Sequence, residues 1–256
     1  MALFEVGNIR HCFGGLVALD QVTFEVRERQ IKAVIGPNGA GKTTLFNIIS
    51  GIFKPDEGQL RFDGISIDGF KPYQVARLGI SRTFQNLSLF LRMTVLENVM
   101  IGRHCRTRKG MLASALRLPG QRKEEKAIRD CAMDHLSDLG LAGMADQPAN
   151  SLSFGQRRMV ELARALATEP RLLLLDEPAS GLNTKETDDL AKRIQRIRDS
   201  GVTILLVEHD MSLVMDISDD ILVLHYGKPI AEGPPSRIRN DPEVVSVYLG
   251  GDDSDA

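Results

Sequence analysis

The stretch Gly36-Pro37-Asn38-Gly39-Ala40-Gly41-Lys42-Thr43 fits the pattern G-x-x-x-x-G-K-[ST] of a phosphate-binding loop. It follows the short apolar run Ile31–Ile35, which predicts a strand, and it precedes a helical stretch over residues 42–50. A glycine-rich backbone can turn its N–H groups toward phosphate oxygens, and the helix N-terminus presents partial positive charge to the same anion. The order of strand, loop and helix therefore predicts an α/β fold that binds a nucleotide. It does not separate kinases, GTPases and motor ATPases.

The side chains at the end of this loop suit a nucleotide that carries Mg²⁺. Lys42 is predicted to reach the β- and γ-phosphates, and the hydroxyl of Thr43 is predicted to bind Mg²⁺. Thr44 can reach the α-phosphate. The predicted nucleotide-binding residues of this segment are Gly36, Pro37, Asn38, Gly39, Ala40, Gly41, Lys42, Thr43 and Thr44.

Two acids follow a second apolar run, Leu172-Leu173-Leu174-Leu175, which predicts a buried strand. Open α/β sheets bind ligands at the carboxyl ends of their strands, where Asp176 and Glu177 stand. Asp176 is predicted to hold the Mg²⁺ shell, directly or through water. Glu177 points elsewhere and can polarise an attacking water as a general base. The alternative, an acidic loop after a core strand, is weakened by the phosphate loop upstream.

Hydrophobic patterning outside these motifs predicts three structural parts. Residues 3–6 and 22–26 alternate apolar and polar side chains around Gly14-Gly15, which predicts antiparallel strands. Residues 94–141 carry apolar side chains at helical spacing, which predicts a helical insertion. Beyond residue 151, helices alternate with apolar strands, which predicts a mostly parallel sheet with helices on both faces. The predicted fold class is a P-loop NTPase core with an antiparallel β subdomain and a helical insertion.

The composition is that of an ordinary soluble globular protein of 256 residues, with 43% hydrophobic and 26% charged residues. Its formal net charge of −2 argues against a mainly electrostatic grip on nucleic acid, so no nucleic-acid partner is expected. No apolar run approaches the roughly 20 residues that cross a bilayer, and the N-terminus lacks the layout of a signal peptide. Cys12, Cys105 and Cys131 share no metal or disulfide spacing and are predicted to be free thiols.

A third motif, Leu152-Ser153-Phe154-Gly155-Gln156, precedes a helical run over residues 157–168. With this motif, the chain over about residues 3–250 resembles the nucleotide-binding subunits of ABC transporters, whose motifs occur in the same order and spacing. The resemblance implies that Ser153 and Gly155 contact the γ-phosphate of an ATP held by the opposite subunit of a dimer, with Gln156 beside them in the ATP-binding set. A helix N-terminus with N–H groups and a hydroxyl is a suitable anion clamp, but the same residues could simply cap the helix.

The same resemblance assigns roles to three residues outside these motifs. Gln85 matches the glutamine that contacts Mg²⁺ or water and links the core to the helical insertion. His209 matches the switch histidine that contacts the γ-phosphate. Phe13 is placed like the aromatic that stacks on adenine, with an ordinary core aromatic as the alternative. The implied cofactors are ATP and Mg²⁺, the catalytic residues are Glu177, His209 and Gln85, and the Mg²⁺ ligands are Thr43, Gln85 and Asp176.

Two positions depart from the family pattern. Phe154 stands where a glycine is common, and Asn183 stands where an aspartate is usual. Asn183 keeps its hydrogen-bonding capacity but lacks the charge. These departures bear on the geometry of the dimer and leave Ser153, Gly155 and Glu177 untouched.

The resemblance implies one ATP-binding domain over residues 1–250. Within it, about 1–85 and 160–250 form the nucleotide-binding core, and about 86–159 form the helical subdomain that carries the signature. Residues 251–256 form an acidic tail that is predicted to be disordered, because it has nothing to bury.

Further motifs narrow the resemblance to the LivG-type ATP-binding subunits of bacterial branched-chain amino acid importers. They are ISRTFQN at 80–86, MTVLENV at 93–99, the Phe154 variant, EHDM at 208–211 and IAEG at 230–233. The implied partners are two integral-membrane permease subunits, a second ATPase subunit, identical or different, and a periplasmic or surface substrate-binding protein. The implied location is peripheral, at the cytoplasmic face of the inner membrane. Cassettes for urea, amides or lipopolysaccharide, and a soluble non-transport ABC ATPase, are the alternatives.

Overall fold

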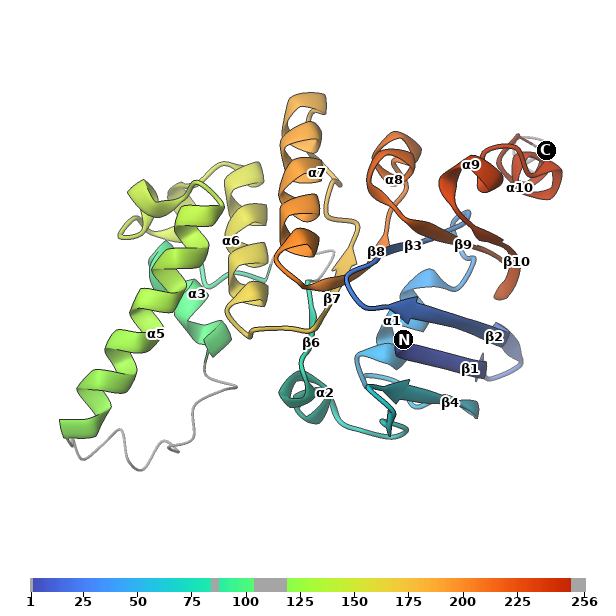
Figure 1. Cartoon of the computed structure of the whole chain (residues 1–256), viewed down its shortest axis with the longest axis horizontal. Coiled ribbons are helices and arrows are strands. Elements are labelled where there is room, and N and C mark those ends of the chain that lie inside the picture. The colour runs from blue at the N-terminus through green and yellow to red at the C-terminus, as the bar shows by residue number, and fades with distance from the viewer. Residues whose placement is uncertain (1, 84–87, 104–118, 250–256) are drawn as a thin grey trace.

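The computed structural model describes residues 2–83, 88–103 and 119–249, with the backbone alone at 119–123 and 249. Two sheets and the helices that pack around them make up these residues (Figure 1). Gln85, Cys105 and the predicted tail fall outside the described residues. Within the described part of the chain, every helix is too short or too polar to cross a membrane.

A six-stranded sheet in the order β10-β9-β3-β8-β7-β6 forms the centre of the fold. Neighbouring strands are parallel except at one edge, where β10 runs antiparallel to β9. All residues of β3, β7 and β8 are buried, as expected for apolar strands that are covered on both faces. The predicted mostly parallel sheet is therefore confirmed. Its strands are β3 (Ile31–Ile35), β6 (Ile80–Arg82), β7 (Leu172–Asp176), β8 (Thr203–Val207), β9 (Asp220–His225) and β10 (Lys228–Gly233).

Different elements cover the two faces of this sheet. Leu172 and Leu174 pack into a core with Phe46, whereas Leu173 and Leu175 pack into a core with helical residues. In Figure 1, α7 and α8 lie on one side of the strands, and α1 lies on the other side with the second sheet. Helices therefore cover both faces, as predicted. The helices around the sheet are α1 (Lys42–Ile49), α2 (Pro72–Leu78), α7 (Thr184–Asp199), α8 (Met211–Ile217), α9 (Pro235–Ile238) and α10 (Pro242–Leu249).

The second sheet is antiparallel and has the strand order β2-β1-β4-β5. β1 and β2 form a hairpin in which Phe13 pairs with Leu16 across the two glycines of the turn. Phe4 and Phe24 are buried beneath this sheet in the core that also contains Leu45 of α1. The predicted antiparallel β subdomain is confirmed. Its strands are β1 (Ala2–Phe13), β2 (Leu16–Arg27), β4 (Glu57–Phe62) and β5 (Ile65–Ser66).

The helical part of the fold packs against one end of the central sheet (Figure 1). Val99 of α3, Leu136 of α5 and Val160 of α6 are buried in one core. Because α6 runs through residue 160, the predicted division of the core at about 159 and 160 falls inside one helix. The division itself stays a prediction. The elements are α3 (Val95–Arg103), α5 (Pro119–Asp138), α6 (Phe154–Leu166) and two 3₁₀ turns at Ala142–Met144 and Ala149–Ser151.

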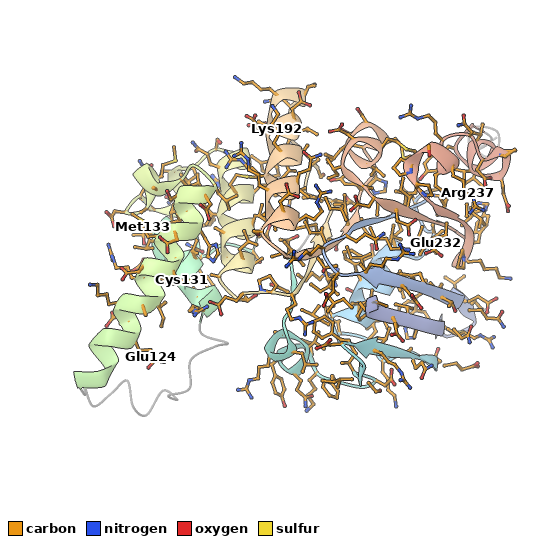
Figure 2. All side chains as sticks on the ribbon, in the orientation of Figure 1. Glu124, Cys131, Met133, Lys192, Glu232 and Arg237 are labelled. Carbon is orange, nitrogen blue, oxygen red and sulfur yellow. The ribbon has the colours of Figure 1, made fainter. Side chains whose placement is uncertain are left out.

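The two described cysteines are free thiols, as predicted. Cys12 lies on β1, and Cys131 lies on α5 (Figure 2). Burial raises the pKa of the Cys131 thiol above its ordinary value. This thiol is therefore mostly protonated near neutral pH.

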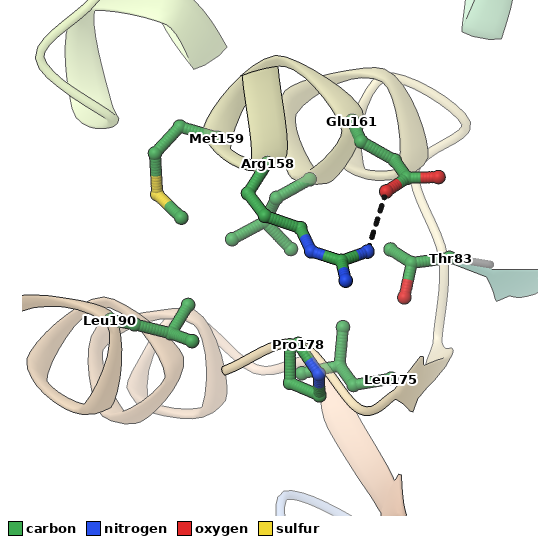
Figure 3. A pocket seen from close by; sticks show the side chains of 8 residues that line it. Thr83, Arg158, Met159, Glu161, Leu175, Pro178 and Leu190 are labelled. Carbon is green, nitrogen blue, oxygen red and sulfur yellow. Dashed lines mark hydrogen bonds and ion pairs between the residues drawn. The ribbon is translucent and has the colours of Figure 1, made fainter. Parts of the chain in front are cut away.

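A buried ion pair lies where α6 packs against the central sheet (Figure 3). Nη1 of Arg158 is 3.4 Å from Oε2 of Glu161, and both side chains are almost fully buried. Thr83, Leu175 and Pro178 line the same small pocket. The ion pair lies within α6, and the helix that carries the signature motif thus faces the end of β7, which Asp176 and Glu177 follow, across this small pocket.

Candidate active site

The phosphate loop connects β3 to α1, and at two positions its backbone requires glycine. Gly36 has a φ of +150°, and a Cβ there would lie 2.1 Å from the carbonyl oxygen of Leu224. Gly41 has a φ of +100°, and a Cβ there would lie 2.6 Å from the carbonyl oxygen of Ala18. Gly41 also caps α1 without a side-chain hydrogen bond. No cap side chain therefore competes with an anion for the N–H groups at the start of this helix.

Lys42 starts α1, and its side chain turns back over the phosphate loop. Its Nζ donates hydrogen bonds to the carbonyl oxygens of Gly36 (2.7 Å) and Pro37 (2.9 Å). Burial lowers the pKa of Lys42 from its ordinary value, while the charges of Glu177 and Asp176 act in the opposite direction. The ammonium group of Lys42 therefore contacts the loop and lies close enough to Glu177 and Asp176 for their charges to affect its pKa.

We expect Lys42→Ala to weaken ATP binding about 10- to 100-fold, because a hydrogen bond to a charged group contributes about 1.5–3 kcal/mol. Equilibrium dialysis with ATP and Mg²⁺ measures the dissociation constant. The matched control is Lys192→Ala, an exposed lysine on α7 (Figure 2), which should leave the constant unchanged. If Lys42→Ala bound ATP as tightly as the control, Lys42 would be excluded as a phosphate ligand.

Asp176 ends β7 and is buried in an ion pair that the sequence did not predict. Its Oδ2 lies 2.7 Å from Nη2 of Arg82, the last residue of β6. Nη1 of Arg82 donates to Oδ1 of Asn47 (2.7 Å) and to Oγ of Ser50 (3.0 Å). The guanidinium thus joins two strand ends to the helix that follows the phosphate loop. The sequence marks Arg82 only as part of the family motif at 80–86. The contact with Asp176 becomes visible only when β6 is seen to pair with β7.

Glu177 and His209 form a second pair of side chains in contact. Oε1 of Glu177 lies 2.7 Å from Nε2 of His209, which follows β8. Glu177 has a φ of +47°, which is uncommon for such a side chain, and its N–H donates to the carbonyl of Val207 (2.9 Å). Strained backbone of this kind occurs often at functional sites. This carboxylate lies beside the phosphate loop and within hydrogen-bond reach of an imidazole, and its role as a general base stays a prediction.

Glu208 fixes the turn that carries His209. Its carboxylate accepts hydrogen bonds from the N–H groups of Ala179 (2.7 Å), His209 (2.9 Å) and Asp210 (3.4 Å). Burial raises the pKa of Glu208 above its ordinary value despite these hydrogen bonds. The sequence identified Glu208 only as part of a family motif, and the structure shows that it holds the backbone on both sides of His209.

One pocket of about 350 Å³ brings most of the predicted residues together. The predicted residues that line it are Phe13, residues 38–44, Glu177 and His209. Phe13 packs edge-on against His11 and Phe53, with ring centroids 4.7 and 5.5 Å away. About half of its surface is exposed, which does not fit the alternative of an ordinary core aromatic. Gly36 and Pro37 contribute the carbonyl oxygens that hold Lys42 in this pocket.

Five predicted ATP-binding residues do not line this pocket: Gly36 and Pro37, whose carbonyl oxygens hold Lys42, and three residues of the signature motif. Ser153, Gly155 and Gln156 stand at the start of α6. Oγ of Ser153 accepts from the N–H of Gln156 (3.3 Å), and Oε1 of Gln156 accepts from the N–H of Ser153 (2.9 Å). Within one chain these residues form a capping box. The structure shows the cap, and contact of these residues with an ATP held by a second subunit stays a prediction.

The two departures from the family pattern are accommodated by local packing. A Cβ on Gly181 would lie 2.9 Å from the ring of Phe154, so this ring covers the loop before α7. Asn183 caps α7: its Oδ1 accepts from the N–H of Glu186, and Oε2 of Glu186 accepts from the N–H of Asn183, both at 3.0 Å. Asparagine and aspartate are equally good at this position of a helix. The loss of charge at Asn183 thus leaves the helix start intact.

Thr43 and Asp176 suit the Mg²⁺ that accompanies a nucleotide. Mg²⁺ in such sites takes one or two protein oxygens and fills its other positions with phosphate oxygens and water. Among the described residues, no group of three or more His, Cys, Asp or Glu side chains could hold a metal by itself. Thr43 lines the pocket, and Asp176 lies close enough to Lys42 to influence its pKa. Gln85, the third predicted ligand, falls outside the described residues.

A phosphate loop that shares its pocket with a carboxylate and a histidine is typical of P-loop ATPases. The family described as ABC transporter matches residues 19–180, and this chain belongs to that family. It is accordingly an ATP hydrolase. A shorter match, to the family described as branched-chain amino acid ATP-binding cassette transporter, covers residues 228–254.

Curated relatives match over nearly their full lengths. The chain is 45% identical to the high-affinity branched-chain amino acid transport ATP-binding protein BraF of Pseudomonas aeruginosa, over 97% of this chain and 98% of that protein. It is 44% identical to the high-affinity branched-chain amino acid transport ATP-binding protein LivG of Salmonella typhimurium, over the same shares. The predicted resemblance to LivG-type subunits is confirmed.

Solved structures of similar fold are nucleotide-binding cassettes. The ADP conformation of an ATP-binding cassette of an ABC transporter has a TM-score of 0.86 at 35% identity, covering 98% of this chain and 99% of that one. A dimeric cassette in a post-hydrolysis state with ADP and phosphate has a TM-score of 0.76 at 26% identity, covering 91% and 98%. Both of these similar cassettes thus bind ADP, and the second is a dimer.

Proposed function

We propose that this chain is the ATPase subunit of an ABC importer of branched-chain amino acids. The pairing of Glu177 with His209 at 2.7 Å, in the pocket of the phosphate loop, supports the ATPase part. The names of the two curated relatives and the match over 228–254 support the cargo. In this assembly the cassette supplies energy, and selection of the amino acid falls to the membrane subunits and the substrate-binding protein.

The residues of the pocket have different roles in the hydrolysis of ATP. Lys42 and the N–H groups of the loop bind the β- and γ-phosphates, and His209 helps them stabilise the charge that develops on the γ-phosphoryl group. Glu177 accepts a proton from the attacking water, and its hydrogen bond to His209 holds the carboxylate in place. Thr43 and Asp176, with Gln85 as the third predicted ligand, would hold Mg²⁺, which would supply positive charge at the phosphates.

Two cassettes would complete each site. Ser153, Gly155 and Gln156 at the start of α6 would meet the γ-phosphate that the loop of the opposite subunit holds. The dimeric relative with ADP and phosphate supports this arrangement. ATP that binds the closed pair more tightly than the open pair shifts the equilibrium toward closure, and hydrolysis reverses the shift. The second subunit is an identical or a different ATPase.

The surface between the central sheet and the helical part would contact the permease subunits. Phe90 and Leu91 in this region are apolar and about half exposed. Buried Asn98 holds their segment, since its Oδ1 accepts from the N–H of Phe90 (2.8 Å) and its Nδ2 donates to the carbonyl of Phe90 (3.1 Å). Exposed apolar side chains on a fixed backbone suit a docking membrane subunit. The chain would then be peripheral, at the cytoplasmic face of the membrane.

Co-purification tests this function. The chain is tagged in its native cell, the membranes are solubilised gently, and the recovered proteins are identified. We expect multi-span membrane proteins, a second cassette and a binding protein that takes leucine, isoleucine or valine in preference to urea. If the binding protein took urea or amides instead, the proposed cargo would be wrong and the transport function would stand. Recovery of soluble partners alone would overturn transport and leave the ATPase assignment in place.

A further inference from the structure

The turn between β9 and β10 presents an aromatic side chain that neither the turn nor the core requires. His225 pairs with Lys228, which leaves Tyr226-Gly227 as a two-residue loop. The φ angles of these two residues are 47° and 77°, the left-handed combination of a type I′ turn. Such turns favour asparagine or aspartate at the first position and disfavour a bulky ring. Tyr226 is 80% exposed, so burial does not compensate for this strain.

This turn is attached to the nucleotide site. The N–H of Gly227 donates to the carbonyl of Ala40 in the phosphate loop (3.1 Å), and the carbonyl of Gly227 accepts from the N–H of Asp20 on β2 (2.9 Å). Nζ of Lys228 lies 3.2 Å from Oδ2 of Asp20. β10 accordingly packs beside β2 (Figure 1). The backbone that carries Tyr226 is therefore fixed relative to the phosphate loop.

Tyr226 lines the same pocket as Phe13 and the phosphate loop, although the two rings come from different hairpins. Together with Leu16 and Val17 they give the pocket four exposed apolar side chains. Lys42 marks the phosphate end of this pocket. An aromatic and apolar part next to a phosphate-binding part fits the base and ribose of a nucleotide.

We propose that Tyr226 contacts the base of the bound nucleotide and forms, with Phe13, the nucleoside end of the pocket. This role rests on the proposed binding of ATP to the phosphate loop and adds a second aromatic residue to it. The ring of His225, with its centroid 4.3 Å from that of Tyr226, packs beside the tyrosine ring. The phenol ring then offers a flat apolar surface on which a base can stack. Stacking of this kind changes affinity about 5- to 100-fold when the ring is removed.

Two substitutions separate the ring from the turn. Tyr226→Asn removes the ring and suits the left-handed backbone, so the turn and the fold are kept. Tyr226→Phe keeps the ring. Isothermal titration calorimetry on the full chain measures the dissociation constants of ATP and of inorganic tripolyphosphate, both with Mg²⁺. We expect Tyr226→Asn to weaken ATP binding about 5- to 100-fold and to leave tripolyphosphate unchanged, while Tyr226→Phe binds both ligands like the unsubstituted chain.

The matched control is Tyr73→Asn, which removes an exposed tyrosine of α2 that does not line the pocket and should change neither constant. Unchanged ATP binding by Tyr226→Asn would overturn the inference. An equal loss for both ligands would also overturn it, because the turn would then support the phosphate loop rather than the base. If the unsubstituted chain bound neither ligand, the proposed function would fall together with this role.

Discussion

We expect Glu177→Gln to lower the turnover of ATP by about 10²–10⁴-fold, the range for removal of a general base, and to leave ATP binding intact. Glutamine keeps an oxygen that can hydrogen-bond to His209, 2.7 Å away in the native pair, but its amide cannot accept the proton of the attacking water. The pocket therefore keeps its shape and loses one chemical step. Phosphate release measures kcat, and equilibrium dialysis measures the dissociation constant of ATP.

The same substitution should also change the state of association. Because hydrolysis reverses closure of the dimer, a chain that binds ATP without hydrolysing it accumulates as an ATP-bound dimer. Size-exclusion chromatography in the presence of ATP detects this species. The control is Glu243→Gln, an exposed acid at the start of α10, which should show normal turnover and no accumulated dimer. Near-normal turnover in Glu177→Gln would remove Glu177 from the role of base.

The parts of the fold that follow from local signals could be predicted from the sequence. The loop pattern requires glycine where the backbone has a positive φ, as at Gly36 and Gly41, so the motif and the geometry are tied together. The continuous apolar run over residues 172–175 predicts a strand buried on both faces, and its alternate leucines do pack into two different cores. Because parallel strands end at the same edge of a sheet, the sequence also placed Asp176 and Glu177 beside the phosphate loop.

Contacts between distant segments could not be predicted in this way. Arg82 and Asp176 are 94 residues apart and meet only because β6 pairs with β7. Tyr226 belongs to a turn whose place beside the phosphate loop depends on the hydrogen bond from Gly227 to Ala40. The role of the signature motif could not be predicted either, because its local pattern fits two roles. Ser153 satisfies a local capping pattern completely, so one chain cannot distinguish a helix cap from an ATP contact.

We expect Arg82→Met to lower the free energy of unfolding by about 3–5 kcal/mol, the cost of leaving one member of a buried ion pair without its partner. The side chains of Arg82 and Asp176 are 7% and 4% exposed, so water cannot replace the guanidinium. Asn47 and Ser50 also lose the hydrogen bonds that it donates. Methionine fills much of the volume of the arginine stem, which keeps the cavity small. Urea unfolding followed by circular dichroism measures the change.

The matched control for this loss is Arg171→Met. The guanidinium of Arg171 lies 2.5 Å from Oδ2 of Asp63 and 3.2 Å from Oε1 of Glu28, but all three side chains are about half exposed. Exposed ion pairs contribute at most about 1 kcal/mol, so the same substitution should cost much less here. Equal losses at Arg82 and Arg171 would show that burial of the Arg82 pair has no energetic consequence.

The double variant Arg82→Met with Asp176→Asn separates the charge from the other contacts of Arg82. Once both charges are gone, no unpaired ion is buried, so the double variant should be more stable than Arg82→Met alone. If it were no more stable, the loss would come from the hydrogen bonds of Arg82 to Asn47 and Ser50 instead. The distinction bears on the site, because these bonds attach the end of β6 to the helix that begins at Lys42, whereas the ion pair acts on the predicted Mg²⁺ ligand Asp176. A gain in the double variant would therefore mean that the charge of Asp176 is balanced inside the chain by Arg82.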